Sequence, residues 1–142
     1  MKRRAFITLL GGAAAWPLVA RAQQSAKLPT IGYLGSGTPA TQSQWVAAFV
    51  QRMRELGLIE GRTIAVEYRW TEGRTERAAE IAAEFVQRKV DVIVTSGTGM
   101  VLAAKQATSV IPIVFAATGD PVGTGLVTSL ARPGGNVTGL SN

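Results

Sequence analysis

Residues 90–98 read Val-Asp-Val-Ile-Val-Thr-Ser-Gly-Thr, an almost continuous apolar run that ends in a short polar turn. Such a run is typical of a strand that is covered on both faces, as in a parallel sheet. Residues 113–116, Ile-Val-Phe-Ala, predict another buried strand, and the residues between the two runs suit a helix. The stretch therefore predicts a strand, a crossover helix and a second parallel strand.

The same alternation extends toward the N-terminus. Residues 31–34 predict a first strand, and residues 64–70 alternate apolar and polar side chains, which indicates a half-exposed strand. A helix fits between them, capped by Thr38 or Thr41 at its start and by Gly57 at its end. Its apolar positions recur at helical spacing and are Trp45, Phe49, Met53 and Leu56.

Three further elements complete the pattern. Residues 75–89 predict an amphipathic helix, residues 125–130 a short helix and residues 137–140 a last strand. Strand and helix thus alternate five times, which predicts an α/β fold: a doubly wound parallel sheet with right-handed crossovers in a three-layer sandwich. Ligands of such a sheet bind at the carboxyl ends of its strands.

The N-terminal 22 residues predict a signal peptide. A basic start, Lys2-Arg3-Arg4, precedes an uncharged apolar stretch and the small-residue site Ala20-Arg21-Ala22, so we expect cleavage before Gln23. The paired arginines favour twin-arginine export, with an ordinary Sec signal as the alternative. The apolar run is too short and too rich in glycine for a membrane span. We therefore expect a polar leader at residues 23–29, a domain at residues 30–142, and a periplasmic location.

Charge and composition exclude several classes of protein. The net charge is +6, but four of the fifteen basic residues lie in residues 1–22, so eleven bases face nine acids in the remainder. This near-balance argues against a nucleic-acid partner. The chain has no cysteine and no histidine. Disulfides, lipid attachment through cysteine, Ser-His-Asp triads and histidine or cysteine metal sites are therefore excluded, and no metal or cofactor is expected.

Several blocks in order carry a family resemblance. They are residues 56–62 (Leu-Gly-Leu-Ile-Glu-Gly-Arg), residues 90–98, residues 111–115 (Ile-Pro-Ile-Val-Phe), residues 120–123 (Asp-Pro-Val-Gly) and residues 132–139 (Arg-Pro-Gly-Gly-Asn-Val-Thr-Gly). The chain resembles the ABC-transporter substrate-binding proteins that include tryptophan and tyrosine binders, with a periplasmic-binding-protein type I fold.

The resemblance implies a function and a missing part. It implies the periplasmic component of an ABC importer, not an enzyme, which captures a small amino-acid-like solute for a permease and an ATPase. Family members have two lobes that close on the solute. The chain ends where the first lobe of a relative passes to the second, so we expect the N-terminal lobe alone, with the second lobe incomplete. The alternative is a truncated fragment without function.

The predicted ligand-binding residues lie where the strands end. Ser96, Gly97 and Thr98 offer hydroxyls and backbone N–H groups at a helix N-terminus, where a carboxylate binds well. Asp120 suits an α-ammonium. The alternatives are a helix cap for either hydroxyl and a turn for Asp120 before proline. The full set is Ser36, Gly37, Trp70, Ser96, Gly97, Thr98, Thr118 and Asp120.

Three side chains need separate interpretation. Trp70 ends its strand beside polar loops and is expected to line a cleft, whereas Trp45 lies on the apolar helix stripe and is expected in the core. Glu84 belongs to a charged series that we interpret as a solvated helix face with pairs such as Glu84–Arg88.

One motif favours a rival function. Residues 35–40 match the loose G-x-G-x-x-G/A dinucleotide fingerprint, so an exported nicotinamide-dependent oxidoreductase is the competing hypothesis. Pro39 removes a backbone donor from the turn that would approach the pyrophosphate. The next strand ends in Tyr68-Arg69-Trp70 without an acid for the ribose, and Glu72 lies too far along. We therefore interpret the match as accidental.

Overall fold

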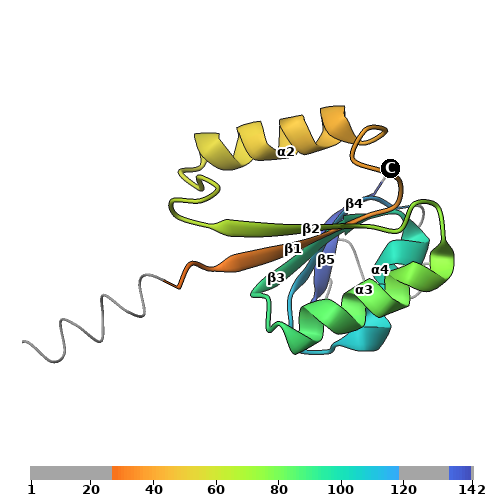
Figure 1. Cartoon of the computed structure of the whole chain (residues 1–142). Helices are drawn as coiled ribbons and strands as arrows, with labels where there is room; N and C mark the ends of the chain where they lie inside the picture. The colour runs from red at the N-terminus through yellow and green to blue at the C-terminus, as the bar shows by residue number, and fades with distance from the viewer. Residues whose placement is uncertain (1–26, 119–134, 142) are drawn as a thin grey trace, which may run out of the picture.

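The computed structural model describes residues 27–118 and 135–141 (Figure 1). All five strands pair in parallel, in the order β2-β1-β3-β4-β5. The elements are β1 (Thr30–Gly35), α2 (Ser43–Glu55), β2 (Ala65–Trp70), α3 (Thr75–Gln87), β3 (Val92–Ser96), α4 (Thr98–Ala107), β4 (Ile113–Thr118) and β5 (Val137–Ser141). The predicted parallel three-layer α/β fold is confirmed, while the helix expected at residues 125–130 lies outside the described residues.

The strand order determines which face each helix covers. The step from β1 to β2 runs one way across the sheet, and the steps from β2 to β3 and from β3 to β4 run the other way. Because crossovers between parallel strands are right-handed, the two directions place their connections on opposite faces. Accordingly, α2 lies on one face, and α3 and α4 lie together on the other (Figure 1).

We call the two surfaces of the sheet the α2 face and the α3/α4 face. The α3/α4 face is closed: Leu34, Ile93, Ile113 and Phe115 are each at most 2% exposed. They pack with Val137 of β5 against small and apolar residues of the two helices, namely Ala78, Ile81, Phe85, Val101 and Ala104. Burial of these side chains stabilises the fold by about 1.5–3 kcal/mol for each large one.

A glycine allows α3 to approach the sheet closely. A Cβ at Gly32 of β1 would lie 2.7 Å from Cδ2 of Phe85. The Phe85 ring, which is fully buried, therefore fills the space that a side chain on β1 would need. Any larger residue at position 32 would displace this ring and loosen the α3/α4 face.

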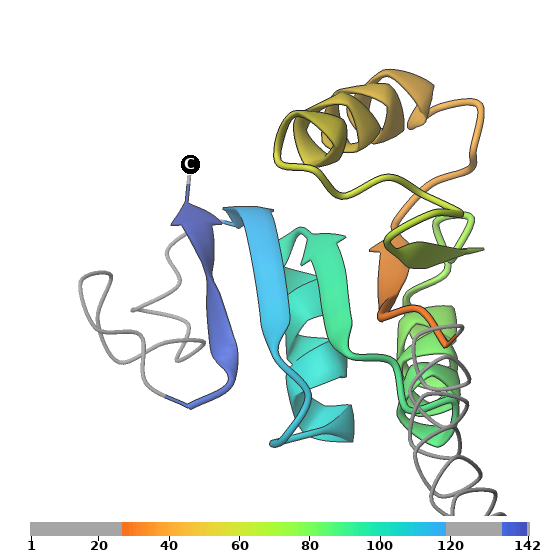
Figure 2. The same cartoon turned by 90° about the vertical axis from the view of Figure 1, so that its left-hand side faces the viewer.

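The α2 face is open over β3, β4 and β5, which corrects two predictions. No residue of α2 is buried, and Trp45, expected in the core, is 62% exposed. Residues 113–116 were expected to be buried on both sides, yet Val114 is 39% exposed and Ala116 is exposed as well. The reason is that α2 lies beside β1 and β2, away from β4 and β5 (Figure 2).

The predicted helix ends are only partly correct. Gly57, at φ 84°, lies at the C-terminal end of α2 as expected, directly after the C-cap residue Leu56. At the other end the N-cap is Gln42, and no side chain caps the helix. Thr38 and Thr41 instead bond to one another: the Thr38 N–H donates to Thr41 Oγ1 at 2.9 Å, and the Thr41 N–H donates to Thr38 Oγ1 at 3.2 Å. The two threonines therefore close the loop before the helix.

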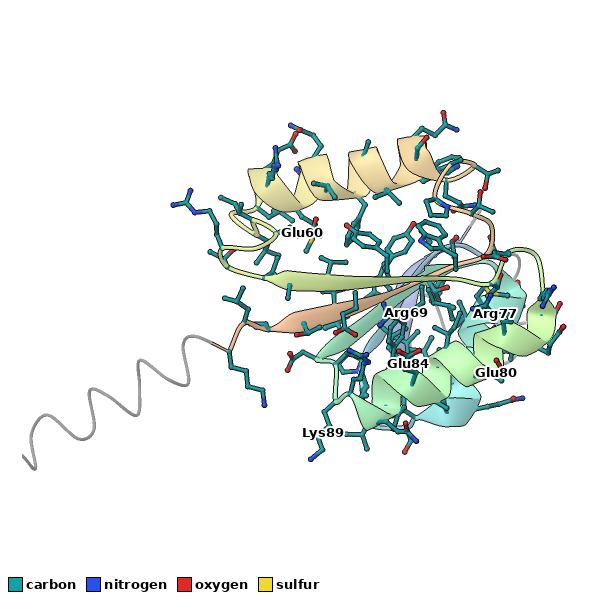
Figure 3. All side chains as sticks on the ribbon, viewed as in Figure 1. Glu60, Arg69, Arg77, Glu80, Glu84 and Lys89 are labelled. Carbon is teal, nitrogen blue, oxygen red and sulfur yellow. The ribbon has the colours of Figure 1, made fainter. Side chains whose placement is uncertain are left out.

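Charged side chains join α3 to the edge strand β2. The expected pair is present, with Arg88 Nε 3.2 Å from Glu84 Oε1. Glu84 Oε1 also lies 3.2 Å from Arg69 Nη2 of β2 (Figure 3). Arg88 Nη1 lies 3.0 Å from Glu67 Oε1. Glu84 therefore links helix to sheet, which corrects its interpretation as part of a solvated face only. Glu80, one turn earlier on α3, is exposed.

Candidate functional site

The loops after β1 and β2 are tied together by backbone hydrogen bonds. The Thr71 hydroxyl donates to the Ser36 carbonyl at 2.7 Å, and the Gly73 N–H donates to the same oxygen at 2.9 Å. The Glu72 N–H donates to the Gly37 carbonyl at 3.0 Å. Glu72 and Gly73 adopt positive φ values of 56° and 79°, which turn the chain back toward β1. Two predicted site residues, Ser36 and Gly37, are thus held in a rigid rim.

The turn after β3 leads directly into α4. Gly97 is the N-cap of this helix, at a φ of 87° that suits glycine. The helix has no side-chain cap, so neither Ser96 nor Thr98 serves the capping role left open from the sequence. The first N–H groups of a helix have no partner within it. Two half-buried hydroxyls and the first N–H groups of α4, which have no partner within the helix, therefore meet at this point.

Thr95 fixes the position of that turn relative to β1. Its hydroxyl donates to the Leu34 carbonyl at 2.7 Å, and the side chain is only 3% exposed. A buried, satisfied hydrogen bond of this kind contributes about 1 kcal/mol. This hydrogen bond holds β3, at the residue directly before Ser96, close to the end of β1.

An aromatic cavity opens between α2 and the α2 face. Its volume is about 300 Å³, and Ser96 lines it together with residues of β1, β3, β4 and the first turns of α2. Tyr33 and Phe49 pack against one another in its wall, with ring centroids 5.5 Å apart and ring planes tilted by 55°. The remaining lining residues are Gln42, Trp45, Val94, Thr95 and Ala116.

The cavity residues were missed from the sequence, apart from Ser96. Trp45 and Phe49 were interpreted as core because of their helical spacing. Their separation of four residues places them on one side of α2, near the turn after β1. The sequence signal that could have identified Trp45 and Phe49 as cavity residues is their position shortly after the polar loop that follows β1.

The other predicted site residues lie apart from this cavity or outside the described part. Trp70 lines a second groove of about 650 Å³ between α2 and the edge strand β2, with Pro39, Val46, Val50, Arg54 and Tyr68 among its neighbours. Its ring lies against Gly35, where any side chain would collide with it. β4 ends at Thr118, and Asp120 lies outside the described residues.

The phenols near these cavities are neutral at physiological pH. Burial raises the pKa of Tyr33 above its ordinary value. Burial, followed by the nearby Glu60 carboxylate, raises the pKa of Tyr68 to about 12. The Tyr68 hydroxyl donates to Glu60 Oε2 at 3.3 Å. The α2 face thus presents uncharged aromatic groups to whatever it contacts.

The glycine-rich turn after β1 does not open a helix. Residues 36–42 separate the end of β1 from Ser43, the first residue of α2. The dinucleotide fingerprint requires its glycines at the N-terminus of the helix, where the pyrophosphate binds. Within residues 27–118 and 135–141, no group of three or more acidic side chains is placed to hold a metal ion. No described helix is long and apolar enough to cross a membrane.

A parallel α/β lobe with a hydroxyl-rich rim, a free helix N-terminus and an apolar cavity at the carboxyl ends of its strands defines a small-molecule-binding class of protein. The family model described as ABC transporter substrate binding protein matches residues 39–142. The chain therefore belongs to this family.

Individual relatives support the assignment. A tyrosine-binding protein of Clostridioides difficile (strain R20291) is 37% identical over 94 residues, which are 66% of this chain and 27% of the relative. A conserved domain protein from Vibrio cholerae is 34% identical, with a TM-score of 0.75 over 82% of this chain and 39% of that one. The ABC domain of a Streptococcus pneumonia protein in complex with L-Trp is 27% identical, with a TM-score of 0.73 over 81% and 39%. The chain thus spans well under half the length of these relatives.

Proposed function

We propose that the chain is the N-terminal lobe of the solute-binding component of an ABC importer, and that its solute is an amino acid or a close analogue. The observation that carries this proposal is the uncapped turn of Ser96, Gly97 and Thr98 beside the aromatic cavity. Membership of the substrate-binding family supports it.

The proposed recognition uses both ends of an amino acid. The carboxylate accepts hydrogen bonds from the first N–H groups of α4 and from the hydroxyls of Ser96 and Thr98. Ser36 and Gly37 supply the facing rim, Thr118 ends the strand β4, and the carboxylate of Asp120, two residues further along the sequence, pairs with the ammonium. Trp70 flanks the rim from the β2 side. The side chain of the solute then points toward the aromatic wall of Tyr33 and Phe49.

Aromatic amino acids are the first solutes to test. The relative from C. difficile is named a tyrosine-binding protein, and the S. pneumonia relative was solved with L-Trp. An aromatic side chain gains both burial and favourable ring contacts in a cavity lined by aromatic residues. This supports tryptophan or tyrosine as the solute.

The proposal includes export and a transport partner. Residues 1–22 act as a twin-arginine signal, and the mature domain works in the periplasm, where it delivers solute to a permease driven by an ATPase. The basic start, apolar stretch and small-residue site of the sequence support this location. Cell fractionation with an antibody to the mature domain checks it: a cytoplasmic protein would contradict the proposal.

The test of binding uses a two-lobed chimaera, in which the chain is continued by the remainder of its V. cholerae relative. Calorimetric titration with L-tryptophan and L-tyrosine should show binding. Asp120→Ala should weaken it about tenfold to a hundredfold, because a charge-assisted hydrogen bond is worth about 1.5–3 kcal/mol. Glu80→Ala is the matched control and should leave the dissociation constant unchanged, since Glu80 is exposed on α3 and away from the rim.

Three results would contradict the proposal in different ways. If Asp120→Ala lowers the melting temperature of the ligand-free chimaera but not its affinity, Asp120 is a turn residue. A nicotinamide dinucleotide retained through purification of the 142-residue chain, identified by mass spectrometry, would establish the oxidoreductase instead. If neither L-tryptophan nor L-tyrosine changes the melting temperature, the chain is a fragment without a binding function.

A further inference from the structure

One edge of the sheet is formed by β2. Within residues 27–118 and 135–141 this strand pairs only with β1, and it is the outermost strand on its side of the sheet (Figure 2). The N–H groups of Ala65 and Thr71 donate to the carbonyls of Pro29 and Gly35, each at 2.9 Å. Because backbone groups alternate in direction along a strand, the N–H and C=O groups of residues 66, 68 and 70 point away from β1. Such a row of backbone groups is a template for pairing with another strand.

The side chains of β2 differ between its two faces. Tyr68 and Trp70 line the groove of about 650 Å³ beside α2, and Val66 lies on the same side of the strand. Glu67 and Arg69 point to the α3/α4 face, where both form the ion pairs described above. Their side chains are 28% and 32% exposed. One face of the edge strand is thus apolar and aromatic, and the other carries one negative and one positive charge.

The guanidinium of Arg69 reaches the outer side of the strand. Its Nη1 donates at 2.9 Å to the carbonyl of Tyr68, which is one of the backbone groups that point away from β1. A guanidinium has several N–H donors in a planar fork, and an ionised carboxylate has several acceptor positions. Arg69 and Glu67 therefore keep bonding capacity beyond their ion pairs within the chain.

The sequence of β2 is complementary to itself in one antiparallel register. In that register Tyr68 lies opposite Tyr68 of a second copy, Glu67 lies opposite Arg69, and Val66 lies opposite Trp70. Residues with outward-pointing backbone groups then face one another, as an antiparallel ladder requires. The two neighbouring registers that also satisfy the backbone place Glu67 opposite Glu67 or Arg69 opposite Arg69, and like charges directly opposite are destabilising. Charge therefore selects the first register over its neighbours.

We propose that the β2 edge is the docking surface for a second copy of this chain. Two β2 strands pair antiparallel about a two-fold axis at Tyr68, and the two five-stranded sheets become one. The axis is perpendicular to the sheet, because residues directly opposite in an antiparallel pair project to the same face. Glu67 then pairs with Arg69 of the other chain twice, once on each side of the axis. A contact of this isologous kind closes on itself and limits the assembly to a dimer.

The grooves beside α2 face one another across this axis. Val46, Val50, Tyr68 and Trp70 give each groove a mainly uncharged wall, so docking removes apolar surface from water. Trp70 opposite Val66 is a favourable cross-strand pair of an aromatic and a β-branched residue. The carboxyl ends of the two β2 strands point in opposite directions. The two solute rims therefore lie at opposite ends of the joined sheet, and the dimer is independent of the proposed function.

Charge reversal tests this surface by sedimentation velocity. The 142-residue chain should sediment as a dimer. Glu67→Arg and Arg69→Glu each place like charges opposite one another on both sides of the axis, and each should weaken dimerisation at least about tenfold. An equimolar mixture should recover the dimer, because a Glu67→Arg chain presents two arginines to the two glutamates of an Arg69→Glu chain. The ion pairs within each chain stay disrupted in the mixture, so a purely structural role of these residues predicts no recovery.

Cysteine cross-linking tests the register, because the chain contains no cysteine of its own. Glu67→Cys chains and Arg69→Cys chains should form a disulfide with each other on mild oxidation, because opposite residues in a non-hydrogen-bonded pair have Cα atoms about 4.5 Å apart. Either variant alone should cross-link poorly, because its two thiols lie two residues out of register, beyond the limit of roughly 7 Å between Cα atoms. Val110→Cys, 83% exposed in the loop before β4, measures random collision.

Three results would overturn the proposal. A monomer at every protein concentration would show that the β2 edge does not pair with a second copy. A dimer that neither charge reversal weakens would place the contact on another surface. Cross-linking of the mixed cysteine variants no faster than that of Val110→Cys would exclude the register, and this measurement decides alone if a charge-reversal variant does not fold. Solute binding by the two-lobed chimaera is measured separately, so the dimer and the proposed function fail independently.

Discussion

The two faces of one sheet differ sharply in this lobe. Ile113 and Phe115 of β4 point to the α3/α4 face and are at most 2% exposed, while Val114, between them, points to the α2 face and is 39% exposed. All three are apolar residues of one strand, so strand propensity cannot explain the difference. The direction of the crossovers explains it: among the described residues, the connections from β2 to β3 and from β3 to β4 step one way across the sheet, and the connection from β1 to β2 steps the other way. Topology, more than local sequence, decides which apolar side chains are buried.

The difference also separates stability from function. The α3/α4 face carries the buried core, and it contributes to the proposed site only through the N-terminus of α4. The α2 face holds the aromatic cavity, Ser96 and the exposed Trp45. Incomplete cover on this face therefore leaves accessible the side chains that recognition would use.

The largest expected effect is on the closed face. Phe85→Ala should lower the free energy of unfolding of the 142-residue chain by about 3–5 kcal/mol, because the ring is fully buried and a cavity remains under β1. Urea unfolding followed by circular dichroism measures this change. If Phe85→Ala leaves too little folded protein, Phe85→Leu should cost about 1.5 kcal/mol or less. A loss near zero for both variants would mean that this face is not the core.

The elements of the fold were predictable because each follows from a local pattern. Residues 64–70 alternate, and Ala65–Trp70 form β2. The amphipathic stretch from residue 75 forms α3, which ends at Gln87, two residues earlier than expected. Which faces of the strands are buried could not be predicted from the local sequence. The run Val-Ile-Val in β3 is compatible with cover on both faces or on one, and only the strand order distinguishes the two.

The site was predictable in part for the same reason. The turn of Ser96, Gly97 and Thr98 was identified because it follows a recognisable strand and opens a helix. The cavity beside it was not, because it depends on where α2 lies relative to β3 and β4. Trp45 was expected in the core, since helical spacing shows which side of a helix is apolar and not whether another element covers that side.

An intermediate effect is expected at alkaline pH, and it reports on the α2 face. The pKa of Tyr68 is raised from 10.0 to about 12, first by burial and then by Glu60. The native state therefore holds this proton at pH values where the unfolded chain has lost it. The stabilisation is complete below about pH 10 and is lost as the pH rises toward about 12, so the free energy of unfolding should fall across that interval.

Ultraviolet titration of phenolate and urea unfolding at about pH 9 and about pH 11 measure this dependence. The chain has two tyrosines, so Tyr68→Phe leaves only the phenol of Tyr33 to titrate. The variant should lose part of the alkaline fall in stability. Ionisation of both phenols near their ordinary pKa would show that α2 does not shield the β1–β2 end of the α2 face.

The smallest expected effect is at Trp45, and it tests the comparison most directly. Trp45→Ala should change the free energy of unfolding of the 142-residue chain by about 1 kcal/mol or less, because most of the indole is already in water. Glu80→Ala, an exposed control on the opposite side of the sheet, should change the free energy of unfolding of the same chain by no more than about 0.5 kcal/mol. A large loss at Trp45 in the 142-residue chain would mean that its own residues already complete the α2 face, and the contrast between the two faces would then disappear.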